Sequence, residues 1–114
     1  MTDNKVYVDQ NGKEMVQVNR ADGLGISIIK KLGIEQLILS TEKNPVVLIR
    51  AKKLKISCIN GVNNKKKILS EYCEKNNLGL QNVAYVGNDL NDLEVINIVG
   101  YSFCPFDAHV NIKE

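Results

Sequence analysis

The stretch YVGNDLNDLEVI, residues 85–96, decides the fold of this 114-residue chain. It begins as an apolar strand and ends in a pattern typical of a helix. Between them, Gly87 is followed by four Asx side chains, at positions 88, 89, 91 and 92. A plain turn rarely needs so many, whereas a divalent cation prefers oxygen ligands of this kind. The stretch therefore predicts a metal-binding loop at the end of a buried strand.

The same order of strand and helix extends outward along the chain. Continuous or alternating apolar runs predict strands at residues 36–40, 55–59, 82–86 and 100–104. Helices are predicted at 22–32, 46–54, 65–75 and 90–98. This alternation indicates an α/β fold with a parallel sheet and right-handed crossovers, over a core from residue 22 to residue 104.

Two further local patterns precede that core. Residues 5–9 (KVYVD) and 15–19 (MVQVN) alternate apolar and polar side chains around an Asn-Gly turn, which predicts a β-hairpin at 5–19. Asp22 can cap the first helix, and Gly33 can end it. The apolar positions of that helix are Leu24, Ile28, Ile29 and Leu32. We expect a single domain over residues 1–114.

Composition excludes several classes of protein. Fifteen Lys and Arg against 13 Asp and Glu give a net charge of +2, which does not suggest a nucleic-acid partner. There is no run of 18 apolar residues, and the N-terminus lacks the pattern of a signal peptide, so no membrane partner is expected. Three widely spaced cysteines fit reduced thiols in a cytoplasmic protein.

Polar side chains follow three of the predicted strands. In a parallel sheet the carboxyl ends of the strands lie at one edge, where ligands bind. Hydroxyl groups and a lysine at this edge can bind phosphate, and the acidic loop can bind Mg²⁺. The residues are Ser40 and Thr41 after the first strand, Asn63, Asn64 and Lys65 after the second, and Asn88, Asp89 and Asp92 after the third.

Each of these elements also has a simpler interpretation. Asx residues before a helix are usually caps, and Ser40 with Thr41 is more often a hydroxyl turn. Lys65, Lys66 and Lys67 can be a solvated helix face. His109 is isolated, and an exposed, inert side chain is the simpler interpretation. The order of the elements on successive strands is the stronger signal.

That order resembles a known family. The stretches KVYVDQNGKE, NRADGLGI, ILSTEKNPVVLIRAKKLKI, GVNNK and AYVGNDLNDLEVI are similar to the haloacid dehalogenase superfamily of magnesium-dependent phosphatases. They resemble more narrowly the 3-deoxy-D-manno-octulosonate 8-phosphate phosphatases and the phosphatase-like C-terminal domain of acylneuraminate cytidylyltransferases. The resemblance implies a Rossmann-like, three-layer parallel sheet with an N-terminal β-hairpin.

The resemblance also implies roles for individual residues. Ser40 matches the family's phosphate-binding hydroxyl, with Thr41 beside it, and Lys65 matches the lysine that steadies phosphate and nucleophile. Ser40 and Lys65 are thus the catalytic candidates. Asn88, Asp89 and Asp92 match the metal-binding loop, with Mg²⁺ as the cofactor. Most members have aspartate where this chain has Asn88, and an amide oxygen brings no charge.

The family's nucleophile has no counterpart here. Members attack with an aspartate of an Asp-x-Asp-Gly motif at the end of the first core strand, and the second aspartate is the general acid and base. The matching pattern in this chain begins just after that motif, and it stops before the family's glycine-rich and Arg-Glu tail. We therefore expect a chain truncated at both ends. Without the first strand, residues 36–40 and 82–86 should pair directly, or another chain should fill the gap.

Three functions remain open at this stage. The first is a phosphatase-family domain for acidic sugar phosphates, octulosonate or nonulosonate 8- or 9-phosphates, inactive as this chain. The second is a non-catalytic oligomerisation domain of an acylneuraminate cytidylyltransferase, forming a homotetramer through the hairpin; Asn88 and the STEKNP stretch favour this lineage. The third is an unrelated flavodoxin-like binding module.

Overall fold

The structure is a computed structural model that describes residues 6–18, 20–105 and 108–113. The chain forms two compact units, one ending at Gly61 and the other beginning at Val62. The prediction of a single domain stays a prediction.

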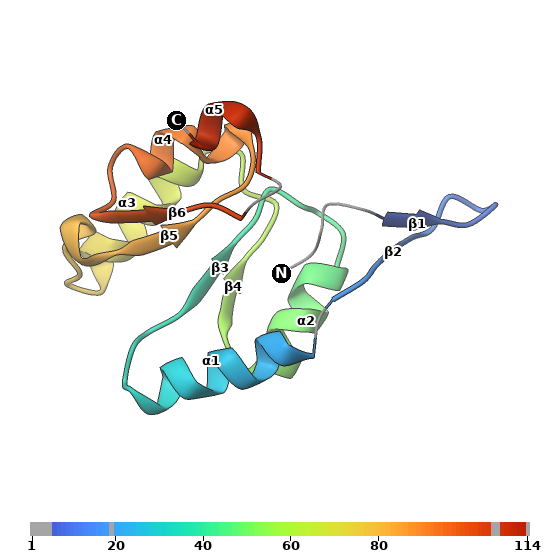
Figure 1. The fold of residues 1–114 in the computed structure, drawn as a ribbon, viewed down its shortest axis with the longest axis horizontal. Coiled ribbons are helices and arrows are strands. Elements are labelled where there is room, and N and C mark those ends of the chain that lie inside the picture. Colours follow the sequence, from blue (N-terminus) through green and yellow to red (C-terminus); the bar gives the residue numbers. More distant parts are fainter. Residues whose placement is uncertain (1–5, 19, 106–107, 114) are drawn as a thin grey trace. The chain divides into compact units, whose positions relative to one another are not determined.

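The first unit contains the hairpin and the first half of the α/β pattern (Figure 1). Its elements are β1 (Val6–Val8), β2 (Glu14–Val16), α1 (Ala21–Lys31), β3 (Leu37–Leu39), α2 (Val46–Leu54) and β4 (Ser57–Ile59). β3 and β4 are parallel, with Ile38 opposite Cys58. α2 packs against β4 and against α1.

The predicted hairpin is confirmed, with strands shorter than expected: Val6–Val8 and Glu14–Val16. β1 and β2 are antiparallel, and Tyr7 lies opposite Met15. The turn runs from Asp9 to Lys13, because the Asp9 carboxylate accepts hydrogen bonds from the backbone N–H groups of Asn11 and Lys13, both at 2.9 Å. Gly12 completes the turn at φ +80°, a conformation that favours glycine. The predicted hairpin ends, residues 5 and 19, lie outside the described part of the chain.

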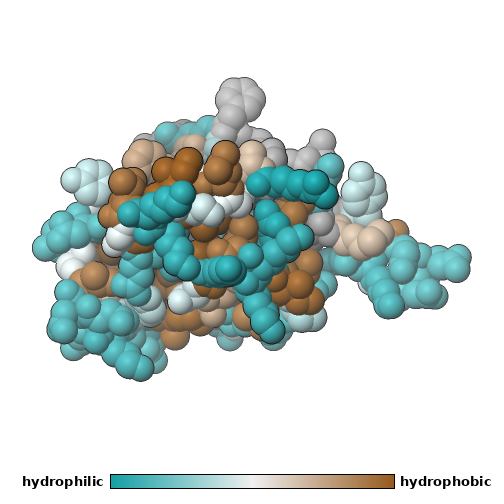
Figure 2. Space-filling model, turned by 90° about the horizontal axis from the view of Figure 1, so that it is seen from below, coloured by the Kyte–Doolittle hydropathy of each residue, from teal (hydrophilic) through white to brown (hydrophobic). Residues whose placement is uncertain are grey.

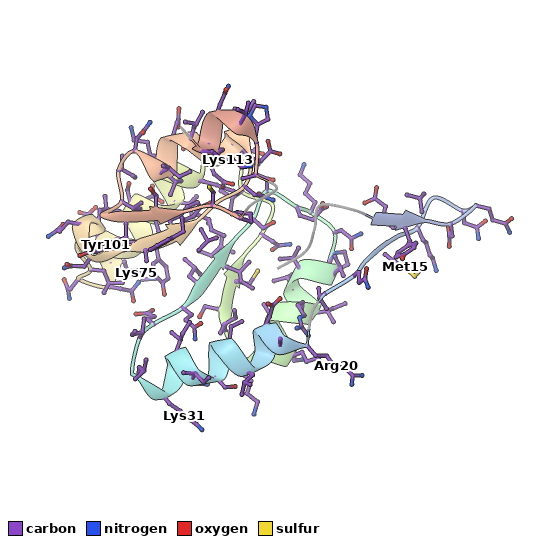
Figure 3. The ribbon with its side chains drawn as sticks, viewed as in Figure 1. Met15, Arg20, Lys31, Lys75, Tyr101 and Lys113 are labelled. Atoms are coloured by element: carbon purple, nitrogen blue, oxygen red, sulfur yellow. The ribbon has the colours of Figure 1, made fainter. Side chains whose placement is uncertain are left out.

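Helix α1 corrects two details of the prediction. The helix begins at Ala21, so Asp22 lies inside its first turn and is not the cap. There its carboxylate interacts favourably with the helix dipole. The four apolar positions 24, 28, 29 and 32 are all exposed, Leu24 to 68%. The less exposed residues of α1 are instead Asp22, Gly23 and Ile26. Figure 3 marks the flanking Arg20 and the last helical residue, Lys31.

The start of β4 is also later than predicted. Lys55 ends α2 in the left-handed conformation, at φ 59° and ψ 42°. Its N–H donates to Lys52 O, and the N–H of Ile56 donates to Ala51 O at 3.1 Å. These bonds belong to the helix end, so only residues 57–59 remain for the strand.

The second unit contains the quoted loop. Its elements are α3 (Lys65–Lys75), the 3₁₀ turn η1 (Leu80–Asn82), β5 (Ala84–Val86), the 3₁₀ turn η2 (Leu90–Asp92), α4 (Leu93–Ile96), β6 (Tyr101–Phe103) and the unpredicted α5 (Val110–Lys113). β5 and β6 are parallel. α3 packs against α4, and both α4 and α5 contact η2. Buried side chains in this unit include Val62, Leu69, Cys73, Val95 and Ile112.

The α/β class is therefore confirmed, with parallel strand pairs in both units. The strand pairs of the described residues are β1–β2, β3–β4 and β5–β6, so the predicted direct pairing of 36–40 with 82–86 is not among them. The alternative prediction, that another chain fills the gap, stays a prediction. Hydrophobic side chains reach the surface on the face shown in Figure 2. No described helix is long and apolar enough to cross a membrane.

Gly100 is the glycine with the least space, which leads to a stability prediction. A Cβ at this position would lie 1.8 Å from the backbone oxygen of Gln81. Since backbone cannot move aside cheaply, Gly100→Ala should lower the free energy of unfolding by about 3 kcal/mol. The matched control is Gly25→Ala in α1, where a Cβ meets nothing within 4 Å. That change should raise stability by about 0.5–1 kcal/mol. Urea unfolding measures both, and equal effects would contradict the prediction.

Candidate functional site

The centre of the site in the second unit is the carboxylate of Asp92, which accepts four hydrogen bonds. Oδ1 accepts from Lys65 Nζ at 2.7 Å and from the Tyr85 hydroxyl at 2.5 Å. Oδ2 accepts from the backbone N–H of Asn88 at 3.0 Å and of Asp89 at 3.3 Å. One carboxylate thus links α3, β5 and the 87–89 loop.

The Lys65–Asp92 pair is shielded from solvent. The side chain of Lys65 is 10% exposed and that of Asp92 4%. A charge this deeply buried needs a partner of opposite charge. The Lys65 ammonium and the Asp92 carboxylate are each other's partner. This placement separates Lys65 from the neighbouring Lys66 and Lys67, which are exposed as the simpler interpretation expected.

Local sequence explains why Lys65 begins α3. Asn64 is the N-cap, with extended φ and ψ, and its side-chain oxygen accepts from the Lys67 N–H at 3.1 Å. Asn side chains are among the preferred N-caps. Lys65 therefore occupies the first helical position, directly after the loop that follows β4.

Gly87 is required by the tight loop after β5. A Cβ at this position would lie 2.7 Å from Asp92 Cβ and 2.9 Å from Asp92 Cγ. Any side chain at position 87 would push the Asp92 carboxylate away from the backbone N–H groups that donate hydrogen bonds to it. Asp89 caps η2, and together with Asp92 it forms a capping box. The Asx residues thus act as caps, and the carboxylate of Asp89 is exposed while that of Asp92 is buried.

The contacts of Asp92 shift its pKa and that of Tyr85. Burial alone would raise the pKa of the Asp92 carboxyl, but the hydrogen bonds from Lys65 and Tyr85 and the charge of Lys65 outweigh burial. The pKa of Asp92 is therefore held below its ordinary value. Burial, followed by the bond to the Asp92 carboxylate, raises the pKa of the Tyr85 hydroxyl far above its ordinary range.

A pH dependence of stability follows from the lowered pKa of Asp92. Its stabilising effect should be complete above the ordinary aspartate pKa of about 3.9, and it should be lost as the pH falls through the lower pKa of the folded state. Asp92→Asn removes the titrating group. The stability difference between the two proteins, measured by urea unfolding, should be constant from pH 7 to 5 and should shrink below about pH 4. A difference that is the same at pH 6 and pH 3 would contradict this.

Ser40 and Thr41 lie in the first unit, after β3. The Ser40 N–H donates to Ile59 O at 3.0 Å, which continues the strand pairing by one residue. Ser40 Oγ accepts from the Glu42 N–H at 3.1 Å, so a hydroxyl turn is present here. Thr41 is exposed. Of the predicted site residues, the structure brings together Lys65, Asn88, Asp89 and Asp92 within one unit.

Two side chains near the site differ in how well the sequence indicated them. Tyr85 was missed, because a tyrosine inside an apolar strand is typical of a core residue; only its spacing of seven residues from Asp92 hints at the contact. His109 is exposed, and its Nδ1 accepts from the Asn111 N–H at 3.2 Å. The expectation that His109 is inert stays a prediction.

The donor set fits Mg²⁺ only if water and phosphate supply most of the ligands. No group of three His, Cys, Asp or Glu side chains suited to a metal occurs in the described part of the chain. Both oxygens of Asp92 already accept two hydrogen bonds each, whereas Asp89 carries an exposed carboxylate. Mg²⁺ is usually bound through one or two protein carboxylates, with waters and phosphate completing the shell.

A polar pocket of about 400 Å³ lies beside Lys65. Its lining combines two lysines, three amides, one carboxylate and one apolar side chain. The residues are Asn63, Asn64, Lys65, Lys66, Leu90, Asn91 and Glu94. The pocket offers both hydrogen-bond donors and acceptors, and Lys65, whose ammonium pairs with Asp92, is one of its lining residues.

Comparison with known proteins matches most of the chain. The family model described as haloacid dehalogenase-like hydrolase matches residues 4–114. The 3-deoxy-D-manno-octulosonate 8-phosphate phosphatase KdsC of Escherichia coli is 36% identical over 110 residues, which are 96% of this chain and 58% of that protein. N-acylneuraminate cytidylyltransferase A of Danio rerio is 32% identical over 112 residues, 95% of this chain and 26% of that protein.

A solved structure also matches closely. The 3-deoxy-D-manno-octulosonate 8-phosphate phosphatase of Moraxella catarrhalis, in complex with magnesium ion, phosphate ion and KDO molecule, has a TM-score of 0.90 and 28% sequence identity. The match covers 97% of this chain and 64% of that chain. The chain thus spans less than two thirds of the length of each of these three proteins.

Proposed function

The chain belongs to the haloacid dehalogenase-like hydrolase family, and on that premise we propose that it is a magnesium-dependent, phosphate-binding domain for acidic sugar phosphates that does not hydrolyse them by itself. The observation that carries the proposal is the buried Lys65–Asp92 pair beside a polar pocket. A lysine held in place by an acid is a fixed point charge for a phosphate group.

Each site residue has a role in this proposal. Lys65 binds a phosphate oxygen, and Asp92 keeps its ammonium in position. The exposed Asp89, with Asn88 beside it, would hold the magnesium ion, which supplies positive charge to the phosphate when bound. The pocket lined by Lys66, Asn91 and Glu94 takes the hydroxyl and carboxylate groups of the sugar acid.

Titration with inorganic phosphate tests the proposal. Calorimetry on the 114-residue chain should show phosphate binding that strengthens when Mg²⁺ is present. Lys65→Gln should weaken this binding about tenfold or more, in line with one lost charge-assisted hydrogen bond. Lys66→Gln is the matched control, since Lys66 is exposed and has no described contact with Asp92. Phosphate binding that is the same in wild type and Lys65→Gln would refute the proposal.

A second candidate function is a non-catalytic oligomerisation domain, as in the cytidylyltransferase lineage. The hairpin favours it. Tyr7, Val8 and Met15 are more than half exposed, and Met15 projects from β2 in Figure 3. An isolated two-stranded hairpin is marginal in water, and an apolar one gains stability by covering these side chains. Under this candidate, the chain assembles as a tetramer through the hairpin.

Sedimentation of hairpin variants tests this assembly. Wild type should self-associate, and Tyr7→Lys should shift it towards monomer because a charge at a buried contact is costly. The matched control is Leu24→Lys, which removes an equally exposed apolar side chain from α1. A monomeric wild type at high concentration, or equal losses of assembly in both variants, would contradict the prediction.

A further inference from the structure

We propose that Tyr85 is a positioning residue, which fixes the ammonium of Lys65 through the carboxylate of Asp92. The consequence for phosphate binding rests on the proposed function, whereas the positioning itself does not. Tyr85 is not one of the predicted phosphate-binding or metal-binding residues. Its hydroxyl donates to Asp92 Oδ1, the oxygen that also accepts a hydrogen bond from Lys65.

Four donors surround the carboxylate of Asp92. Oδ2 is attached to the 87–89 loop through the backbone N–H groups of Asn88 and Asp89. Those two hydrogen bonds fix Oδ2, but they leave Oδ1 free to turn about the Oδ2 contacts. Tyr85 and Lys65 are the described donors to Oδ1. The orientation of Oδ1 therefore depends on this tyrosine and this lysine.

The two donors to Oδ1 differ in stiffness. A tyrosine ring has two rotatable side-chain bonds, and Tyr85 lies in the middle of β5, opposite Ser102 of β6. A lysine has four, and its side chain loses much conformational entropy when it is fixed. The stiffer group on the paired strand thus determines where Oδ1 lies. The flexible lysine then follows Oδ1, with Nζ at 2.7 Å.

Tyr85→Phe removes only the hydroxyl and leaves the ring. Asp92 would keep its loop contacts and would retain Lys65 as the described donor to Oδ1. The Lys65 ammonium should then exchange between positions. Tyr101→Phe on the neighbouring strand β6 is the matched control, because this tyrosine is 61% exposed and has no described contact with the Asp92 group. Figure 3 labels Tyr101.

The experiment is ¹H–¹⁵N spectroscopy of the lysine ammonium groups in the whole 114-residue chain. In wild type and Tyr101→Phe, the Lys65 ammonium should give a separate, slowly exchanging signal. In Tyr85→Phe this signal should broaden or disappear while the backbone spectrum remains that of a folded protein. A Lys65 signal that is unchanged in Tyr85→Phe would overturn the proposal, since a purely structural role would leave it in place.

A wild-type measurement covers the case in which Tyr85→Phe does not fold. The hydroxyl proton of Tyr85 should exchange with water more slowly than that of the exposed Tyr101. Equal exchange rates would overturn the proposal without any variant.

Phosphate titration then separates this proposal from the proposed function. Tyr85→Phe should weaken phosphate binding about tenfold or more, the range for residues that orient a binding group. Equal phosphate affinity in wild type and Lys65→Gln would refute the proposed function, and the ammonium signal would still decide the role of Tyr85.

Discussion

Lys65→Gln is expected to lower the free energy of unfolding by about 3–5 kcal/mol, the range for breaking one side of a buried ion pair. The Asp92 side chain, 4% exposed in the structure, would have a weaker neutral donor in place of the ammonium. Its hydrogen bonds to Tyr85 and to the backbone amides of Asn88 and Asp89 would compensate for only part of the lost charge. Urea unfolding at pH 7 measures the change.

Two controls make this expectation specific. Lys66→Gln removes the same charge from an exposed position of the same helix, so its effect should lie within about 0.5 kcal/mol of zero. The double variant Lys65→Gln with Asp92→Asn should lose less stability than the sum of the two single changes, with a coupling of about 0.5–3 kcal/mol. Additive losses, or a Lys65→Gln protein as stable as Lys66→Gln, would show that the pair contributes no buried charge interaction.

The second large effect concerns catalysis. The 114-residue chain should release no phosphate above background from 3-deoxy-D-manno-octulosonate 8-phosphate in the presence of Mg²⁺. Its sequence contains no Asp-x-Asp-Gly motif. The family resemblance implies that this motif supplies the nucleophile and the general acid. Loss of the general acid alone is worth about 10²–10⁴ in rate. Loss of the nucleophile closes the covalent route.

A chimera provides the positive counterpart. The E. coli phosphatase is longer than its match to this chain. The family resemblance implies that the nucleophile motif comes before the matched region. Joining that preceding segment to this chain should create phosphatase activity, and Lys65→Gln in the chimera should remove most of it. The E. coli protein itself is the assay control. Activity in the unmodified chain that disappears in Asp89→Ala would show instead that the nucleophile lies in the 87–92 loop.

The order of strands and helices was predictable, because each strand is a short apolar run bounded by turn residues. The predicted bounds of α2 (46–54) and α3 (65–75) are those of the structure, but other element boundaries were not predictable. The residues before β4, Lys55 and Ile56, look like part of a strand, yet Lys55 adopts a left-handed conformation that few lysines adopt. Asp22 looks like a cap but lies two residues after the N-cap, Arg20.

The candidate site was predictable as a set of residue types but not as a set of contacts. The spacing of Asn88, Asp89 and Asp92 predicts oxygen ligands, yet it does not say that Asp92 points at Lys65. The contact of Tyr85 depends on the fold of the loop between β5 and η2, which no periodicity describes. Similarly, the apolar stripe of α1 predicts a buried face, whereas exposure depends on which elements lie against it.

The central claim is that this chain binds acidic sugar phosphates without hydrolysing them, and one ³¹P spectrum series tests both halves. The chain is added in steps to 3-deoxy-D-manno-octulosonate 8-phosphate with Mg²⁺. Glucose 6-phosphate, whose sugar carries no carboxylate, is run in parallel as the control. The account predicts that the phosphate-ester signal of the sugar acid shifts or broadens more than that of glucose 6-phosphate, with no signal of inorganic phosphate. An ester signal that does not respond to the chain, or a growing signal of inorganic phosphate, would contradict it.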